Sequence, residues 1–105
     1  MNDKILSLLG LAARGRNLVS GEFSTEKAVK KGRAALVIVS EDASDNTRKM
    51  FTNMCKFYEV PRYFFGTKEE LGYAIGKEMR SSLAITDENF AGAIEKRLEQ
   101  LGNCE

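Results

Sequence analysis

The longest apolar run in the chain is Ala34–Val39, which has no polar residue at alternate positions. A short run that is apolar throughout predicts a strand with both faces covered, as in a sheet with helices on either side. The run is far shorter than the stretch of about 20 apolar residues that a membrane-spanning helix needs. It therefore favours a layered α/β body with a buried central strand.

Helix and strand patterns alternate along the whole chain. We expect four strands, over residues 17–20, 34–39, 61–65 and 82–86. We expect five helices: over about 3–14, between Gly21 and Gly32, from Ser44 or Asp45 onward, from Thr67 to Gly76, and from Asp87 onward. In a chain of 105 residues, this order predicts one domain, residues 1–105, folded as a three-layer α/β/α sandwich. Its sheet is expected to be small and either mixed or mostly parallel.

The predicted helices carry cap residues and apolar stripes. Ser44 or Asp45, Thr67 and Asp87 can cap the last three, and Thr67 with Glu70 has the spacing of a capping box. The faces expected to be buried are Ile5, Leu8, Leu9 and Ala12 in the first helix, Met50, Phe51, Met54, Cys55 and Tyr58 in the third, Leu71 and Ile75 in the fourth, and Phe90, Ile94, Leu98 and Leu101 in the last.

The second predicted helix opens at Gly21, closes at Gly32 and carries Lys27, Lys30 and Lys31. A helix N-terminus presents unpaired N–H groups and a partial positive charge, so it can hold a phosphate or another anion. Residues 1–35 contain seven basic residues and three acids, a net charge of +4, whereas the remaining 70 carry −3. This asymmetry indicates a basic face directed at a polyanion, the alternative being a solvated surface with uneven charge.

Several classes of site are excluded by composition. The chain contains no histidine and no CxxC pair, which removes the usual zinc sites, Ser-His-Asp triads and Cys-His pairs. Cys55 is expected to be a core residue and Cys104 to be incidental in the tail. No nucleotide-binding fingerprint is present. We therefore expect no catalytic residues, no metal and no cofactor, and, because no signal peptide is evident, a cytoplasmic location.

Two further polar clusters are open to more than one interpretation. Glu41 and Asp42 follow the central strand and could form a magnesium site like that of a receiver domain, a polar turn leading to a helix cap, or acceptors for base amino groups. The segment Arg80–Ser82 is either a structural loop or part of a positively charged rim beside the start of the second helix. Arg14 and Arg16 are expected to be surface cations near that helix.

Five segments together resemble the ribosomal protein L7Ae superfamily of kink-turn RNA binders, most closely its small bacterial, YlxQ-like members. They are Leu9–Ala12, Leu18–Gly21, Lys27–Gly32, Ala35–Ala43 and Leu71–Lys77. The resemblance covers about residues 3–98 and is specific in combination. It implies an α/β/α sandwich that binds structured RNA and is often associated with the ribosome.

The resemblance also implies roles for particular positions. Gly21 and Lys27 match the start of the family's second helix, which enters the kinked RNA loop. The segment Arg80–Ser82 matches the family loop that packs on the flipped-out nucleotide. Glu41 and Asp42 match the family's acidic pair after the central strand. Archaeal members carry Asn-Glu where this chain has Phe23 and Ser24. Phe23 cannot hydrogen-bond a guanine edge; it either stacks on a base or belongs to the core.

These observations lead to a non-enzymatic, ribosome-associated RNA-binding protein as the first hypothesis, with structured RNA and ribosomal proteins as partners and a monomeric state. The expected contacts are Lys27, Lys30 and Arg33 on phosphates, Gly21 at a close backbone approach, and Ser20, Phe23, Ser24, Arg80, Ser81 and Ser82 along a base-binding rim. A second hypothesis is a protein-interaction module on the same fold that has lost its RNA contacts. An enzyme is the least favoured.

Overall fold

The computed structural model describes residues 3–101, so Cys104 lies outside the described residues. Along the chain it contains α1 (Asp3–Arg14), β1 (Leu18–Ser20), α2 (Glu22–Lys30), β2 (Leu36–Val39), α3 (Asp45–Tyr58), β3 (Arg62–Phe64), α4 (Lys68–Ala74), β4 (Ser82–Ile85) and α5 (Glu88–Gln100). Each element lies where the sequence pattern predicts it. None of the helices in this part of the chain is long and apolar enough to span a bilayer.

The four strands form one sheet in the order β1-β4-β2-β3. β4 pairs antiparallel with both β1 and β2, and β2 pairs parallel with β3. The sheet is therefore mixed, which is the first of the two arrangements that the sequence predicts, and not mostly parallel. The reason is the direction of β4, which enters between two earlier strands and runs against both.

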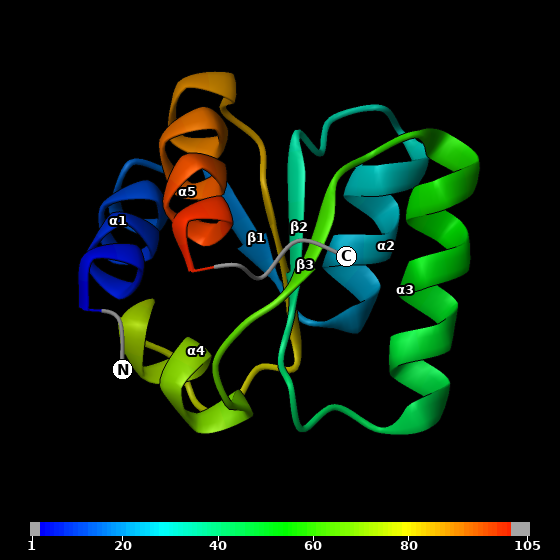
Figure 1. Cartoon of the computed structure of the whole chain (residues 1–105), viewed down its shortest axis with the longest axis horizontal. Coiled ribbons are helices and arrows are strands. Elements are labelled where there is room, and N and C mark those ends of the chain that lie inside the picture. Colours follow the sequence, from blue (N-terminus) through cyan, green and yellow to red (C-terminus); the bar gives the residue numbers. More distant parts are fainter. Residues whose placement is uncertain (1–2, 102–105) are drawn as a thin grey trace.

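Helices cover both faces of the sheet, which confirms the three-layer sandwich (Figure 1). α1, α4 and α5 lie on one face and α2 and α3 on the other. Alternate residues of β2 enter two different cores: Leu36 and Ile38 pack with α1, α4 and α5, whereas Val37 and Val39 pack with α2 and α3. All four are fully buried, which explains why the run is apolar at every position.

The predicted caps are present at three helices. The Ser44 hydroxyl accepts a hydrogen bond from the Thr47 N–H at 3.2 Å, and Asp87 accepts one from the Phe90 N–H at 2.9 Å. Thr67 and Glu70 form the reciprocal capping box. Such caps satisfy N–H groups that the helix itself leaves unpaired, so these starts are set by local sequence.

Two residues of the predicted stripes are exposed instead of buried. Tyr58 is 41% exposed and Leu101 is 48% exposed. Tyr58 is the last residue of α3 and packs edge-on against Phe57, with ring centroids 4.9 Å apart. Leu101 caps the end of α5. Both positions follow the helical period, but each lies at a helix terminus, where the stripe runs past the element that it packs against.

Gly72 brings α4 into close contact with the loop that precedes β4. A Cβ at this position would collide with the carbonyl oxygen of Glu78. The Arg80 N–H donates to the Lys68 carbonyl at 3.0 Å, and the Lys77 N–H donates to the Gly72 carbonyl at 2.8 Å. The missing side chain therefore lets α4 hold the Arg80 loop at the end of the sheet.

We expect Gly72→Ala to lower the free energy of unfolding by about 1–3 kcal/mol, because backbone must move to make room for the methyl group. Gly92→Ala is the matched control, since a Cβ there meets nothing within 4 Å. In the exposed interior of α5 it should raise stability by about 0.5–1 kcal/mol. Urea unfolding of the two variants measures the difference, and equal values would contradict a close contact at Gly72.

Cys55 is a core residue, as expected, with 2% of its surface exposed. Desolvation raises the pKa of its thiol from 9.0 to about 11, partly offset by the nearby Arg62 cation. Because the thiolate is the reactive form, this thiol should be inert at neutral pH.

In a Cys104→Ser variant, Cys55 should therefore react with a thiol reagent at pH 8 about a hundredfold more slowly in the folded than in the unfolded chain, from the loss of thiolate alone. The folded state holds the thiol proton more tightly, so stability falls as pH rises from 9.0 toward about 11. Labelling in and out of urea tests the first point. Equal rates would mean that the thiol is accessible.

Candidate nucleic-acid interface

Four chain segments meet at one end of the sheet, the lower end in Figure 1. The Gly21 N–H donates to the Ser82 carbonyl at 2.9 Å, and the Ser40 N–H donates to the Ser81 carbonyl at 2.9 Å. The Glu41 N–H donates to the Gly66 carbonyl at 2.7 Å. The end of β1, the start of β4 and the ends of β2 and β3 thus form a continuous row.

Gly21 begins α2 in a conformation open to few other residues. Its φ of 94° and ψ of 156° lie in a region that is essentially restricted to glycine. No side chain caps this helix start, in contrast to α3, α4 and α5. A Cβ at Gly21 would have nothing within 4 Å. The first turn of α2 therefore presents backbone N–H groups that an external anion can approach.

Arg80 lies beside this turn in a fixed position. Its Nε donates to the Ser20 Oγ at 3.1 Å, and one Nη donates to the Met79 carbonyl at 3.0 Å. These bonds hold the guanidinium at the end of β1, next to Gly21. The structure thus brings the Arg80 loop and the start of α2 together into one positively charged rim, the second of the two interpretations of that loop.

Phe23 is 76% exposed, so its interpretation as a core residue is wrong. The residue occupies the first turn of α2, where its side chain extends outward from the sheet instead of into either core. The Lys27 Nζ lies 5.9 Å from the centroid of its ring, one helical turn further on. An exposed aromatic ring with an adjacent cation is a surface on which a flat ring can stack.

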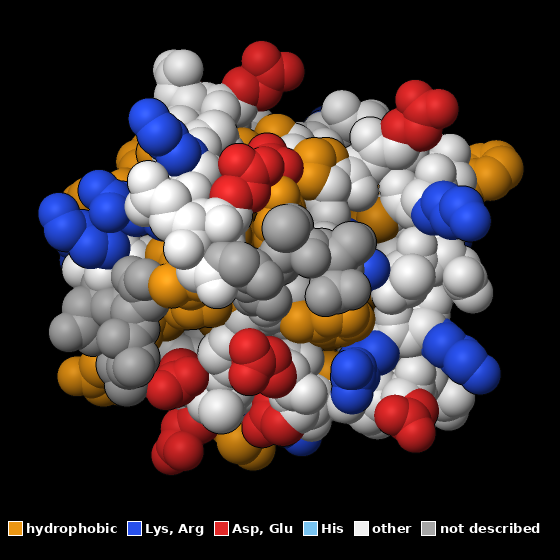
Figure 2. All heavy atoms as spheres, in the orientation of Figure 1, with side chains coloured by type: hydrophobic (Ala, Val, Ile, Leu, Met, Phe, Trp, Pro, Cys, Tyr) orange, Lys and Arg blue, Asp and Glu red, His pale blue; other side chains and the backbone are white. Residues whose placement is uncertain are grey.

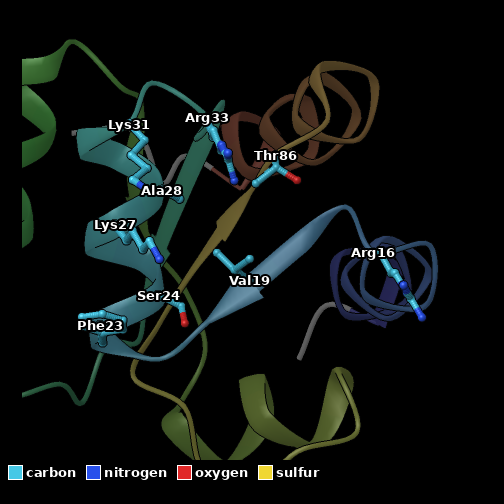
Figure 3. Close-up of a pocket in the computed structure, with 9 residues that line it drawn as sticks. All are labelled: Arg16, Val19, Phe23, Ser24, Lys27, Ala28, Lys31, Arg33 and Thr86. Carbon is cyan, nitrogen blue, oxygen red and sulfur yellow. The ribbon is translucent and has the colours of Figure 1, made fainter.

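A hollow of about 390 Å³ lies between α2 and β1 (Figure 3). Phe23, Ser24, Lys27 and Ala28 line it from α2, and Lys31 lines it from the position just after that helix. Val19 lines it from β1, and Arg33 and Thr86 lie at its far end. Arg16 also contributes, although its side chain points away from the others in Figure 3. Four of the nine lining residues, Arg16, Lys27, Lys31 and Arg33, are cations and none is acidic.

The charge on other parts of the surface is more mixed. Acidic and basic side chains are interspersed on the face drawn in Figure 2, and several acidic ones gather at its lower end, in the region of α4. Glu69 and Glu70 lie in the first turn of that helix. The hollow beside α2 differs because its lining carries cations alone.

Residues 3–95 match the family described as Ribosomal protein L7Ae/L30e/S12e/Gadd45. The chain belongs to this family.

Two curated relatives support the membership in the L7Ae family. The chain is 45% identical over 92 residues to "RNA-binding protein YlxQ" of Bacillus subtilis (strain 168), which covers 88% of this chain and 92% of that protein. It is 34% identical over 97 residues to the protein of the same name from Enterococcus faecium, over 92% of this chain and 93% of the relative. The predicted likeness to small, YlxQ-like bacterial members is confirmed.

Solved structures agree with the fold. A protein of unknown function from Bacillus halodurans C superposes with a TM-score of 0.90 at 40% identity, covering 93% of this chain and 99% of that one. A Giardia lamblia 15.5kD RNA binding protein gives a TM-score of 0.78 at 26% identity, with coverage of 96% and 92%. The L7Ae-type architecture therefore extends over nearly the whole chain.

Two predicted contact residues of this L7Ae-family chain are engaged elsewhere in the structure. Lys30 forms an ion pair with Glu26 at 2.8 Å, and the hydrogen bond that it donates to the Glu26 carboxylate raises the pKa of the lysine. Lys30 does not line the hollow. Ser82 is fully buried, and its hydroxyl lies 3.5 Å from that of Thr25. The Ser82 side chain packs between α2 and β4. Only the Ser82 carbonyl lies beside Gly21, from whose N–H it accepts a hydrogen bond.

Glu41 and Asp42 lie along the same end of the sheet, on the side of the Arg80 loop away from Gly21. The Asp42 carboxylate accepts a hydrogen bond from the Lys68 N–H at 2.9 Å. Desolvation acts to raise the pKa of this carboxyl, but hydrogen bonds, that of Lys68 foremost, lower it below its ordinary value. Within residues 3–101, no three acidic, cysteine or histidine side chains gather where they could hold a metal ion. The pair forms the polar turn that leads to the Ser44 cap.

Lys31 and Arg16 belong to the hollow but were not among the predicted contacts. Lys31 was recognisable as part of the basic helix, and Arg16 as a nearby cation. Their inclusion depends on which face of α2 meets β1, which the helical period of α2 does not reveal because only Thr25, Ala28 and Val29 are buried.

We expect Gly21→Ala to lower the free energy of unfolding by about 1–3 kcal/mol, because alanine is strained at the φ and ψ of this position. Glu22→Ala, at the next and exposed position, should change it by less than about 0.5 kcal/mol. Chemical denaturation of both variants gives the comparison. If Gly21→Ala were as stable as the parent protein, the backbone conformation that opens the helix start would be contradicted.

Proposed function

We propose that this chain is a non-enzymatic, cytoplasmic RNA-binding protein that recognises structured RNA at a kink-turn or another internal loop and associates with the ribosome. The observation that carries the proposal is the meeting of Gly21, Phe23 and Arg80 at one uncapped helix start. The relatives named as RNA-binding proteins support it, because they match over most of both chains.

Each part of the rim suits a different part of a folded RNA. The open N–H groups of the first turn and the Arg80 guanidinium suit phosphate oxygens. The open space at Gly21 allows an RNA strand to approach the backbone closely. Phe23 provides a stacking surface for an unpaired base, which internal loops expose and regular duplexes do not.

The family resemblance matches Phe23 and Ser24 to the positions where archaeal members carry an Asn-Glu pair that reads G·A pairs. A phenyl ring cannot form the hydrogen bonds of an Asn-Glu pair, but it can stack on a base. Stacking depends less on the identity of the base than hydrogen bonding does. We therefore infer that the chain recognises the bend and the unpaired bases of its RNA more than the edges of particular pairs. Glu41 and Asp42 lie on the far side of the Arg80 loop, where they can accept hydrogen bonds from base amino groups.

Phe23→Ala should weaken binding to an internal-loop RNA by about ten- to a hundredfold, as expected for loss of stacking worth about 1–3 kcal/mol. Phe57→Ala is the matched control, because Phe57 is 78% exposed and lies on α3, away from the rim. Fluorescence anisotropy with a synthetic RNA that joins two stems through an asymmetric loop with tandem G·A pairs measures both. Equal losses of RNA affinity in the two variants would contradict a contact between Phe23 and the RNA.

Crosslinking in cells, followed by sequencing of the attached RNA, tests the ribosomal part of the proposal. Enrichment of ribosomal fragments that contain internal loops is the expected result. Absence of RNA above background, together with protein partners that survive nuclease treatment, would favour a protein-interaction module on the same fold.

A further inference from the structure

We propose that the outer edge of β1 is a docking site for an acidic, extended segment of a partner protein, which adds to the sheet as a further strand. The inference goes beyond RNA binding at the start of α2. It rests on backbone groups of β1 and on a second basic hollow, which lies on the α1 and α4 side of that strand.

β1 has backbone groups that face away from the sheet. It is the first strand in the order β1-β4-β2-β3, so it pairs along one edge only. The Asn17 carbonyl and the Gly21 N–H form hydrogen bonds of 2.9 Å at the two ends of the β1–β4 ladder. Hydrogen-bonded pairs alternate in an antiparallel ladder, so Val19 also faces β4. The N–H and C=O groups of Leu18 and Ser20 therefore point to the opposite side, where no strand lies within residues 3–101.

A hollow of about 470 Å³ borders this edge on the α1 and α4 side. Three of its nine lining residues are exposed cations, and none of the nine is acidic. Arg14 and Arg16 come from the end of α1 and the turn after it, and Lys77 comes from the turn after α4. Arg16 and Val19 also line the hollow beside α2. The edge of β1 therefore runs between two hollows whose charged lining residues are all basic.

An added strand can use both hollows at once. It would lie about 4.8 Å from β1, and its successive side chains would point to opposite faces of the sheet. Acidic side chains at consecutive positions would then enter the two hollows in turn. In strand addition, main-chain hydrogen bonds supply affinity and the flanking pockets select the side chains. The matching partner is an extended segment with several consecutive aspartates or glutamates.

The strand edge favours a polypeptide over other polyanions. An RNA strand could neutralise the cations, but its backbone has no N–H and C=O groups to pair with Leu18 and Ser20. A second copy of this chain, paired edge to edge through β1, would bring the two sets of cations together. Basic residues beside an edge strand disfavour such self-pairing. An acidic strand from another protein satisfies both the backbone groups and the charges.

The ends of β1 limit the length of the added ladder. The backbone φ is 62° at Arg16 and 94° at Gly21, so the chain leaves strand geometry close to each end. An added strand can pair with Leu18–Ser20 only, which offers four outward backbone groups. We therefore expect a modest affinity that depends on the backbone ladder and on the charges together.

The test uses a labelled peptide of about eight residues, with about four consecutive glutamates between threonines, and measures binding by fluorescence anisotropy. A second peptide carries N-methyl groups on its glutamates, which keeps the charge but removes the donors of the ladder. A uridine oligonucleotide with about the same charge is the nucleic-acid probe. The protein variant is Arg14→Gln/Lys77→Gln. Its control, Lys49→Gln/Lys56→Gln, removes two exposed lysines from α3.

We expect the N-methylated peptide to bind the parent protein at least about tenfold more weakly than the plain peptide, because it cannot form the ladder. The Arg14→Gln/Lys77→Gln variant should bind the plain peptide about three- to thirtyfold more weakly, and the α3 variant should stay within about twofold of the parent. Saturating peptide should slow amide hydrogen exchange at Leu18 and Ser20 by about tenfold or more, with little change at Val19, which already faces β4.

Equal affinity for the two peptides overturns the inference, because charge alone would then explain the binding. Unchanged hydrogen exchange at Leu18 and Ser20 overturns it as well, since the peptide would lie elsewhere or fail to bind. This measurement uses the parent protein, so it holds even if the double variant is unstable. A uridine oligonucleotide that binds more tightly than the peptide, and that the Arg14→Gln/Lys77→Gln variant weakens, would assign the hollow to nucleic acid and reject the peptide.

Discussion

The antiparallel pairing of β4 with both β1 and β2 is the interaction on which the candidate interface depends. β4 is the last strand in the sequence, yet it lies between the first two. Its first residues therefore meet the end of β1 on one side and the end of β2 on the other, through the Ser82 and Ser81 carbonyls. Without this insertion, the Arg80 loop and the start of α2 would have no reason to be neighbours. Because buried strands must pair their backbone groups, the position of the loop follows from the ladder itself.

Small residues let the surrounding elements close on this arrangement. At Gly72 the absence of a Cβ lets the loop before β4 pack across α4, and at Gly21 a positive φ lets the chain leave β1 and enter α2 in a single residue. The buried Thr25 and Ser82 hydroxyls lie between α2 and β4. Two polar side chains thus brace the inner face of α2, while its outer face keeps Phe23 and Lys27 available. The rim thus has buried, packed residues beneath it and exposed side chains above it.

The edge position of β1 explains why a basic hollow exists beside α2. β1 has three residues and pairs on one side only, so no further strand fills the space along its free edge. Side chains from α2 and from the turn after it extend into that space. Lys30, one residue from Lys31 along the chain, instead pairs with Glu26, because neighbouring residues on a helix point about 100° apart. Helix geometry therefore places two adjacent lysines in different surroundings, Lys30 in an ion pair and Lys31 beside the hollow.

Local sequence by itself determined the elements and their ends. Ser44, Thr67 and Asp87 cap helices through hydrogen bonds to residues three positions away, so these helix starts can be recognised without distant contacts. The apolar run of β2 likewise shows by itself that both faces of the strand must be covered. The family resemblance, carried by motifs along the chain, predicts RNA contacts at Gly21, Lys27 and the Arg80 loop. Tertiary structure alone decided that Phe23 is exposed, that the Ser82 side chain is buried, and that Lys31 shares a hollow with Arg33. Those outcomes depend on strand order, on the direction of β4 and on which face of α2 meets the sheet. Such relations join residues up to about 60 positions apart, as between Arg80 and Ser20, and no local pattern records them.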